Sequence, residues 1–177
     1  MNRTRKVILF IAVSLDGYIA TKENGLEFLS LVEDEGQDYS YTDFVNSVDT
    51  VIVGRKSYEK VLSMAMEYPL MDKNVYVVTH TPKTSVGSIQ YFSGDLKQLV
   101  LDQKSKEGKN IYVDGGAEIV NEMLQDNLID EFYISIIPTL LGTGIPLFKN
   151  DRPEQTLKLI STKTFNKGLV QLHYAKA

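Results

Sequence analysis

The stretch Asn110-Ile111-Tyr112-Val113-Asp114-Gly115-Gly116-Ala117-Glu118 passes from an apolar strand pattern through a glycine pair into a helical pattern. The same order recurs at residues 50–59, where Gly54-Arg55-Lys56 stands between an apolar run and a second helical pattern. A third apolar run ends in Ser14-Leu15-Asp16-Gly17-Tyr18-Ile19-Ala20. Loops at the carboxyl ends of strands are where open α/β sheets bind ligands. A basic pair and a glycine pair at helix starts suit a phosphate-bearing cofactor, because helix N-termini offer free N–H groups.

The composition fits a single globular domain over residues 1–177. Hydrophobic residues make up 43% of the chain, and 19 basic against 23 acidic residues give a net charge of −4 at pH 7. This mildly acidic balance argues against nucleic-acid binding, which draws on Lys- and Arg-rich surfaces. The chain has no cysteine, which excludes disulfides and thiolate metal sites. His80 and His173 lie far apart in the sequence, so we expect no metal site.

The amino-terminal region resembles a secretory signal only superficially. A basic segment, residues 1–6, precedes the apolar run Val7–Val13, which is followed by Asp16 and Gly17 without a small-residue cleavage pattern. A buried first strand explains this run better. No segment approaches the length of a transmembrane helix, so we expect a cytoplasmic protein that does not contact a membrane.

Strand and helix patterns alternate along most of the chain. Strands are predicted at Lys6–Val13, Thr50–Val53, Asn74–Thr79, Ile89–Phe92, Asn110–Val113 and Glu131–Ile137. Helices are predicted at about Tyr39–Ser47, Ser57–Met64, Asp95–Lys106 and Ala117–Asp126. Two further strand patterns, Leu157–Phe165 and Leu169–Ala175, are joined by the turn signal Asn166-Lys167-Gly168. The sequence therefore predicts an α/β fold: a mainly parallel sheet with helices on both faces and a C-terminal antiparallel hairpin.

The chemistry of the glycine loops can be argued from the residues. Gly54 permits close approach of a ligand to the backbone, and Arg55 with Lys56 places two cations beside a helix N-terminus. Gly115 and Gly116 allow positive φ and close approach before the next helix begins. Each loop has a plainer interpretation as well: a solvated basic pair in the first case, and a tight strand-to-helix turn in the second.

The chain resembles the dihydrofolate reductase fold, and within it the RibD C-terminal branch that includes the reductase of bacterial riboflavin synthesis. Five segments in the family's order carry the resemblance: residues 12–20, residues 53–59, Val77-Val78-Thr79-His80-Thr81, Val113-Asp114-Gly115-Gly116-Ala117, and residues 130–148 with Pro138-Thr139-Leu140-Leu141-Gly142-Thr143-Gly144. Together they span nearly the whole chain. The Rossmann pattern G-x-G-x-x-G is absent.

The resemblance implies NADPH as the cofactor and assigns roles to several segments. Arg55, Lys56 and Ser57 would hold cofactor phosphates beside Gly54. Gly115, Gly116, Ala117 and Glu118 would contact the nicotinamide and pyrophosphate. Thr79, His80 and Thr81 would face the adenosine end and the 2′-phosphate, which favours NADPH over NADH. Ala12, Gly17 and Ile19 would lie close to the nicotinamide.

Hydride transfer also needs a proton, which a sheltered carboxylic acid can supply or relay. Counted back from Gly54, Asp38 falls where folate reductases carry their acidic pterin-binding residue. Residues 33–38 read equally well as a solvated acidic loop. Asp16 is the competing candidate, with substrate binding as its alternative role. Asp38 and Asp16 are therefore the two predicted catalytic acids.

Departures from the family's pattern leave the substrate open. The chain has no tryptophan, which disfavours dihydrofolate as the substrate, and it has no zinc-deaminase signature. We expect reduction of a small heterocycle, a ribosylaminopyrimidine as in riboflavin biosynthesis. The alternatives are a non-catalytic NADP(H)-binding dimer and a dihydrofolate or pterin reductase variant. The apolar segment 138–148 favours a buried or interface role, either in a homodimer, which is usual in this branch, or as a flap over its own core.

Overall fold

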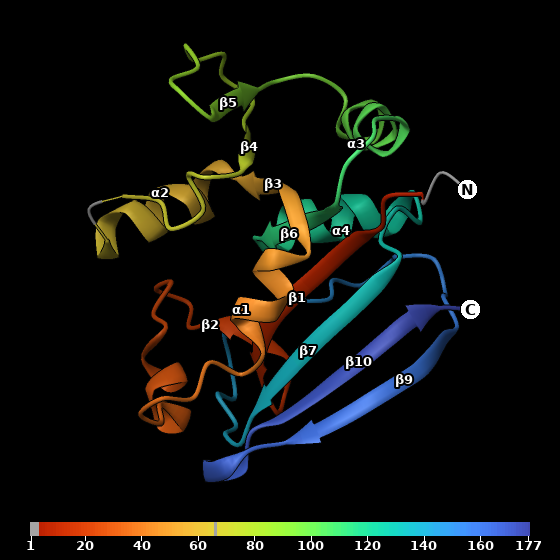
Figure 1. Cartoon of the computed structure of the whole chain (residues 1–177). Coiled ribbons are helices and arrows are strands. Elements are labelled where there is room, and N and C mark those ends of the chain that lie inside the picture. The colour runs from red at the N-terminus through yellow and green to blue at the C-terminus, as the bar shows by residue number, and fades with distance from the viewer. Residues whose placement is uncertain (1–3, 66) are drawn as a thin grey trace.

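The computed structural model describes residues 4–65 and 67–177, and it is built on one eight-stranded sheet (Figure 1). The strand order is β5-β4-β3-β6-β1-β7-β10-β9. The strands are β1 Val7–Ser14, β3 Val48–Gly54, β4 Asn74–Val78, β5 Ile89–Phe92, β6 Asn110–Gly115, β7 Glu131–Ile137, β9 Leu157–Thr164 and β10 Val170–Lys176. Neighbours from β5 to β7 are parallel, whereas β10 is antiparallel to both β7 and β9. The predicted parallel sheet and C-terminal hairpin are confirmed.

Helices cover both faces of the sheet, as predicted. The helices α1 Tyr41–Asn46 and α2 Arg55–Met64 contribute Phe44 and Tyr58 to the core on one face. The helices α3 Leu96–Ser105 and α4 Ala117–Gln125 contribute Leu99 and Met123 to the core on the other. Apolar strand residues alternate between the two clusters, which is why the central strands are apolar along their whole length.

Helices α1 and α2 each begin two residues away from the predicted start, for local reasons, whereas the other helix boundaries agree to within one residue. Helix α1 begins at Tyr41 and not Tyr39, because Tyr39 and Ser40 have φ values of 55° and 66° and so cannot be helical. Helix α2 begins at Arg55, two residues earlier than predicted, directly after the extended residue Gly54.

Short elements held by tertiary contacts were not predicted. Strand β2 (Tyr18–Ala20) pairs antiparallel with β8 (Ile145–Pro146), and two 3-10 helices occur, η1 (Glu27–Val32) and η2 (Asn166–Gly168). The pairing of β2 with β8 joins the loop after β1 to the apolar segment 138–148. Within that segment Leu147 is fully buried, whereas Leu140 is exposed, so part of it covers the chain's own core.

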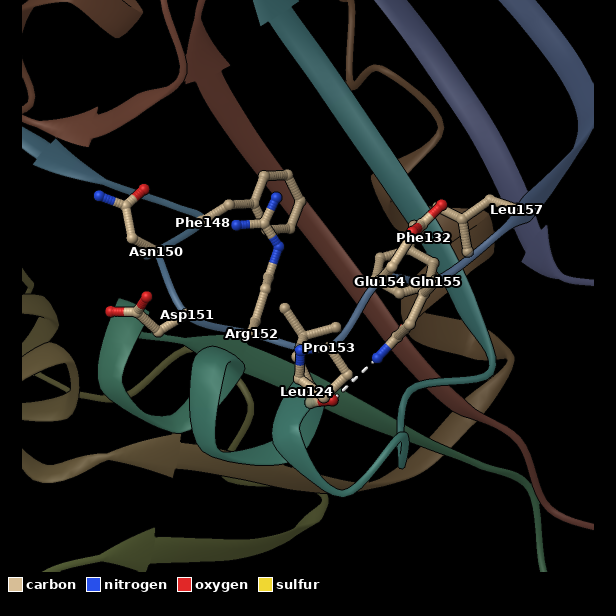
Figure 2. Close-up of a pocket in the computed structure, with 10 residues that line it drawn as sticks. All are labelled: Leu124, Phe132, Phe148, Asn150, Asp151, Arg152, Pro153, Glu154, Gln155 and Leu157. Carbon is tan, nitrogen blue, oxygen red and sulfur yellow. Dashed lines mark hydrogen bonds between the residues drawn. The ribbon is translucent and has the colours of Figure 1, made fainter.

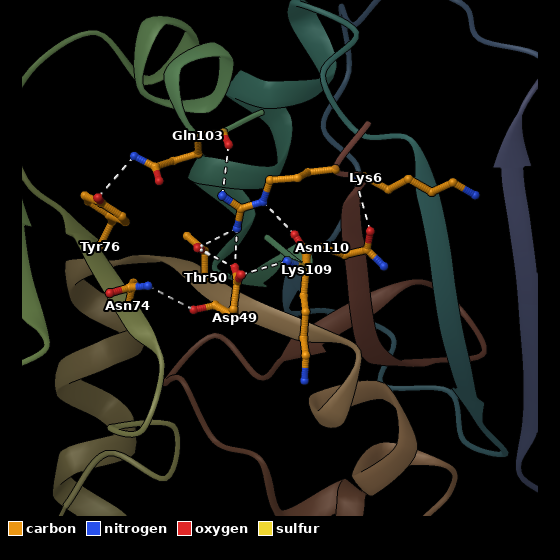
Figure 3. Close-up of polar contacts among 9 residues, drawn as sticks. Lys6, Asp49, Thr50, Asn74, Tyr76, Gln103, Lys109 and Asn110 are labelled. Carbon is orange, nitrogen blue, oxygen red and sulfur yellow. Dashed lines mark hydrogen bonds and ion pairs between the residues drawn. The ribbon is translucent and has the colours of Figure 1, made fainter. Parts of the chain in front are cut away.

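The amino-terminal end of the sheet is fixed by Arg5, a buried guanidinium. It donates to Thr50 Oγ1 at 2.8 Å, to the Gln103 carbonyl at 2.9 Å and to the Lys109 carbonyl at 2.6 Å, and it forms an ion pair with Asp49. Figure 3 shows these four partners gathered from β3, α3 and the loop before β6. Arg5 therefore connects the start of β1 to three other parts of the fold.

None of the described helices is both long enough and apolar enough to cross a membrane.

Candidate functional site

The carboxyl ends of the parallel strands bring the predicted cofactor segments to one edge of the sheet. Strands β1, β3, β4 and β6 end at Ser14, Gly54, Val78 and Gly115, and neighbouring strands run in the same direction. Nearly all of the predicted cofactor residues lie at the ends of these strands or in the loops and first helical turns that directly follow them. Convergence of loops at this edge is the usual geometry of ligand sites in open α/β sheets.

The glycine loops after β3 and β6 are in direct contact. Val53 pairs with Gly115, and a Cβ atom on Gly54 would lie 3.0 Å from Ile119 Cγ1 and 3.5 Å from the Gly116 nitrogen. A Cβ atom on Gly116 would lie 2.6 Å from Ser57 Oγ. The peptide bond between Gly115 and Gly116 is cis. A side chain at either turn would crowd Ile119 or Ser57, and glycine leaves the backbone uncovered where the two turns meet.

Helices α2 and α4 both begin at these turns. Their preceding residues, Gly54 and Gly116, make no side-chain capping hydrogen bond, so the first N–H groups of both helices lack that partner. Two such N-termini side by side form a favourable environment for a pyrophosphate. Of the remaining residues predicted there, Ala117 is buried, and the exposed Glu118 pairs with Lys149 at 2.5 Å.

One of the two predicted cations, Arg55, pairs with a carboxylate. Arg55 Nη1 lies 2.6 Å from Glu59 Oε2 one turn along α2, and Lys83 Nζ lies 3.4 Å from Glu59 Oε1. The hydrogen bond from Arg55 is the main cause of a lowered pKa of Glu59, so this carboxylate is ionised at neutral pH. A phosphate would therefore compete with Glu59 for Arg55. Lys56, on the same turn, is exposed.

The turn after β4 lies next to this group of charges. The buried Thr79 accepts a hydrogen bond at Oγ1 from the Thr81 N–H at 3.2 Å, and its own N–H donates to the Phe92 carbonyl at 2.9 Å. His80 and Thr81 are exposed, and Lys83 connects the turn to α2 through Glu59. The structure therefore brings the predicted 2′-phosphate segment beside the predicted phosphate-binding segment.

The loop after β1 is held by Asp16. Its carboxylate accepts hydrogen bonds from Ser14 Oγ at 2.6 Å, the Leu141 N–H at 3.1 Å and the Gly142 N–H at 2.7 Å. The bond from Ser14 is the largest cause of a lowered pKa of Asp16, although the side chain is exposed. Asp16 is therefore an ionised carboxylate that joins the loop after β1 to the segment 138–148. An ionised carboxylate that accepts three hydrogen bonds is disfavoured as a proton donor. The catalytic role of Asp16 stays a prediction.

The other residues predicted near the nicotinamide flank Asp16. Ala12 lies on β1, Gly17 occupies the turn with φ of +87°, and Ile19 on β2 packs against the core on the α3/α4 face. Their proximity to a nicotinamide stays a prediction.

Asp38 caps the start of helix α1. Its Oδ1 accepts from the Ser40 N–H at 3.0 Å and its Oδ2 from the Thr42 N–H at 3.1 Å. The pKa of Asp38 is lowered, chiefly by the hydrogen bond with the Thr42 side chain, and the carboxylate is exposed. Capping accounts for this residue without catalysis, so its predicted role as an acid rests on the resemblance alone.

A third acid, Asp114, was missed by the sequence reasoning. It lies on the same face of β6 as Tyr112, whose hydroxyl is 2.7 Å from Asp114 Oδ1, and the Tyr68 hydroxyl donates to Oδ2. Burial raises the pKa of Asp114, and the two tyrosine hydrogen bonds oppose that rise only in part. The position of an acid immediately before the glycine pair was the available sequence signal.

We expect Asp114→Asn to stabilise the protein at neutral pH by about 0.5–2 kcal/mol. Because the folded state raises the pKa of Asp114, folding stability from this group is present below its unfolded pKa and is lost as pH rises through the folded pKa. Asparagine stays neutral and avoids that loss. Urea denaturation as a function of pH checks this: the variant's advantage should shrink in acid, and a constant difference would contradict the interpretation.

A cavity lies in another part of the fold. Its volume is about 510 Å³, and its lining includes Leu124 at the end of α4 and Phe132 at the start of β7 (Figure 2). Those positions belong to the amino edge of the parallel strands, opposite the glycine loops. None of the predicted site residues lines it, so the convergent loops are the better candidate site.

The sheet order, the antiparallel hairpin and the glycine loops at the carboxyl edge together define a dihydrofolate reductase-like fold. The chain belongs to the RibD C-terminal domain family, whose model matches residues 5–171. This confirms the family resemblance found in the sequence.

Known proteins resemble the chain over nearly its whole length. The protein called "Uncharacterized protein YwjB" of Bacillus subtilis (strain 168) is 42% identical over 174 residues, covering 98% of this chain and 99% of that protein. The crystal structure of a putative riboflavin biosynthesis protein from Shewanella sp. PV-4 is 31% identical with a TM-score of 0.87, covering 97% of this chain and 99% of that one. Dihydrofolate reductase from Enterococcus faecalis, complexed with NADP(H) and RAB-propyl, is 14% identical with a TM-score of 0.68, covering 99% of both chains, and supports the fold alone.

Proposed function

We propose that the protein is an NADPH-dependent reductase that transfers a hydride to a small heterocyclic substrate. The observation that carries this proposal is the contact between the Gly54 and Gly116 turns, where two helices without side-chain caps begin side by side. Membership of the RibD C-terminal domain family supports a reductase-like activity.

The residues present fit a dinucleotide. Gly54 and Gly116 place no side chain over the N-termini of α2 and α4, Arg55 and Ser57 lie in the first turn of α2, and Lys83 is linked to α2 through Glu59. Bound NADPH supplies a hydride from its nicotinamide. This chain's own residues hold the phosphates, orient the ring and supply a proton to the substrate.

A ribosylaminopyrimidine is the substrate we propose first. Support comes from the family and from the Shewanella protein, whose name places it in riboflavin biosynthesis. NADPH oxidation across pyrimidine, pterin and quinone acceptors tests this choice. NADPH binding without any turnover would favour the non-catalytic alternative, and inhibition by methotrexate-type compounds would favour the pterin reductase.

Arg55→Ala is expected to weaken NADPH binding about tenfold, less than the roughly 1.5–3 kcal/mol of a full charge-assisted hydrogen bond. The loss is reduced because Arg55 already pairs with Glu59 in the free chain. Glu59→Gln should act in the opposite direction, since it removes the group that competes with phosphate. Calorimetric titration with NADPH and NADH measures both effects, and equal affinity of the wild type for the two cofactors would contradict the role of the Thr79–Lys83 turn.

We also propose a homodimer. Strand β9 is an edge strand of the sheet, and its Leu159 and Ile160 side chains are 50% and 49% exposed. An exposed apolar edge strand invites pairing with another chain. Analytical ultracentrifugation measures the mass directly, and a monomer at all concentrations would reject the proposal.

A further inference from the structure

We propose that Gln171 of the C-terminal hairpin is a positioning residue for the substrate side of the candidate site, an inference that rests on the proposed reductase function. Gln171 lies on β10 and is buried, although its side chain is polar. Its amide nitrogen donates to the Tyr39 carbonyl at 3.1 Å and to Ser135 Oγ at 3.1 Å. The first bond connects the hairpin to the residues directly before helix α1, 132 residues earlier in the chain.

The turn before α1 has a strained backbone. Tyr39 and Ser40 have φ values of 55° and 66°, a conformation that residues other than glycine rarely adopt. Two such residues in succession persist only where surrounding contacts hold them, and strain of this kind concentrates at functional sites. Asp38 holds the turn from within the same segment, through the Ser40 N–H. The further partners come from the C-terminal hairpin.

Two side chains of the hairpin reach this turn together. Lys163 on β9 and Gln171 on β10 are direct partners in the strand pairing, so both side chains lie on the same face of the sheet. Lys163 Nζ donates to Ser40 Oγ at 2.8 Å, next to the Tyr39 carbonyl that Gln171 holds. The Tyr39 ring also packs edge-on against Phe165, with ring centroids 5.1 Å apart. Lys163 is exposed whereas Gln171 is buried, so the Gln171 bond is the contact that solvent replaces least well.

The turn determines where Tyr41, the first residue of α1, lies. The Tyr41 ring packs edge-on against Phe10 of β1, with ring centroids 5.7 Å apart, and remains 36% exposed. Burial, followed by the charge of Asp114, raises the pKa of Tyr41 to about 12, so Tyr41 is a neutral phenol at neutral pH. The influence of that charge places Tyr41 beside the end of β6, where Gly115 and Gly116 would contact the nicotinamide.

The hydroxyl group of Tyr41 is available to a ligand. The Tyr68 and Tyr112 hydroxyls both hydrogen-bond to Asp114, whereas the Tyr41 hydroxyl has no protein partner within residues 4–65 and 67–177. A phenol can donate and accept, and an aromatic wall with a single free polar group suits a heterocycle that carries carbonyl or amino groups. Tyr41 therefore contacts the substrate, and Gln171 acts through Tyr41.

The first experiment compares Gln171→Met with a matched control, Gln103→Met. Methionine keeps the length of the side chain but has no amide. Gln103 is also buried, and its amide donates to the Tyr76 hydroxyl at 3.1 Å on the α3/α4 face of the sheet. Both variants should lower the melting temperature, because each removes a buried hydrogen bond.

The two variants should differ in their kinetics. Gln171→Met should raise KM for the pyrimidine acceptor that the wild type reduces by about fivefold, the loss expected for one hydrogen bond. Its kcat and its Kd for NADPH should change less than twofold, and Gln103→Met should change none of the three constants. Equal KM values in the two variants would overturn the inference. If Gln171→Met does not fold, Gln171→Asn replaces it, because the shorter amide cannot reach the Tyr39 carbonyl, and a normal KM in that variant has the same meaning.

A double variant tests whether Gln171 acts through Tyr41. Tyr41→Phe alone should raise the same KM about fivefold, because it removes the hydroxyl and keeps the ring. Adding Gln171→Met to Tyr41→Phe should raise KM less than twofold further, since residues that act through one contact are not additive. Two full effects that multiply in the double variant would show that Gln171 does not act through Tyr41, and the inference would fail.

The last experiment does not need a substrate. In protein labelled with 3-fluorotyrosine, the fluorine NMR signal of Tyr41, assigned from the Tyr41→Phe variant, should shift in Gln171→Met and stay in place in Gln103→Met. A Tyr41 signal that does not move in Gln171→Met overturns the inference alone. Failure of the wild type to bind NADPH overturns the proposed function, and the inference with it.

Discussion

Arg5→Ala is expected to lower the free energy of unfolding by about 3 kcal/mol, because it removes a buried guanidinium from several partners, and each buried polar group left unsatisfied costs about 1–3 kcal/mol. The guanidinium is buried and satisfies Asp49, Thr50 and two backbone carbonyls at once. Removing it leaves the Asp49 carboxylate with one fewer partner and takes away the guanidinium donors to Thr50 and to the Gln103 and Lys109 carbonyls. The loss should therefore exceed the value of any single hydrogen bond.

Urea denaturation of Arg5→Ala measures this loss, and Lys97→Ala provides a matched control. Lys97 also pairs with an aspartate, Asp126 at 2.7 Å, but both side chains are exposed, so its removal should cost less than about 1 kcal/mol. Arg5→Lys should fall between the two, because an ammonium keeps the charge but cannot reach all four partners. Equal losses in Arg5→Ala and Lys97→Ala would show that the buried cluster does not stabilise the sheet.

The sheet could be predicted from the sequence because its signals are local. Central strands such as β1 and β3 are apolar on both faces, so each appears as a continuous aliphatic run. Strands β2 and β8 could not be predicted, because they are only 3 and 2 residues long and exist through their pairing with each other. The start of α1 was placed too early because positive φ at Tyr39 and Ser40 is imposed by the surrounding structure.

The candidate site was likewise predictable only where its signals are local. Glycines before helix starts are local signals, so the Gly54 and Gly116 turns were found from the sequence. The environment of Asp114 depends on Tyr68, 46 residues away, and on burial that no sequence window contains. Likewise Asp16 owes part of its lowered pKa to the Gly142 N–H, 126 residues away. Residue type located these acids, but only tertiary contacts distinguish the acid whose pKa is raised from those whose pKa is lowered.

Gly116→Ala is expected to weaken NADPH binding at least tenfold, about 1.4 kcal/mol, while leaving the fold intact. Gly116 has φ of −80° and ψ of −166°, a conformation that alanine adopts without strain. The added methyl group would lie 2.6 Å from Ser57 Oγ, and rotation of the serine side chain can relieve that contact. The effect on NADPH binding that remains is the volume of the methyl group, which is added where the α2 and α4 N-termini meet.

Comparison with Gly115→Ala distinguishes the effect of added side-chain volume from the effect of backbone strain. Gly115 has φ of +98°, which alanine rarely adopts, and a Cβ atom there would touch only Ile11 Cδ1 at 3.9 Å. This variant should therefore lower the melting temperature, whereas Gly116→Ala should leave it nearly unchanged and lower the affinity for NADPH.

The double variant Ser57→Ala/Gly116→Ala identifies how the methyl group acts. If it acts by displacing Ser57, the double variant should bind NADPH no more weakly than Ser57→Ala alone. If the methyl group occupies the space of the cofactor itself, the double variant should lose at least tenfold more than Ser57→Ala. We expect the second result, because the two helix N-termini can hold a pyrophosphate only where no side chain covers the backbone. Unchanged affinity in Gly116→Ala would place the cofactor away from this turn and would remove the observation on which the proposed reductase function rests.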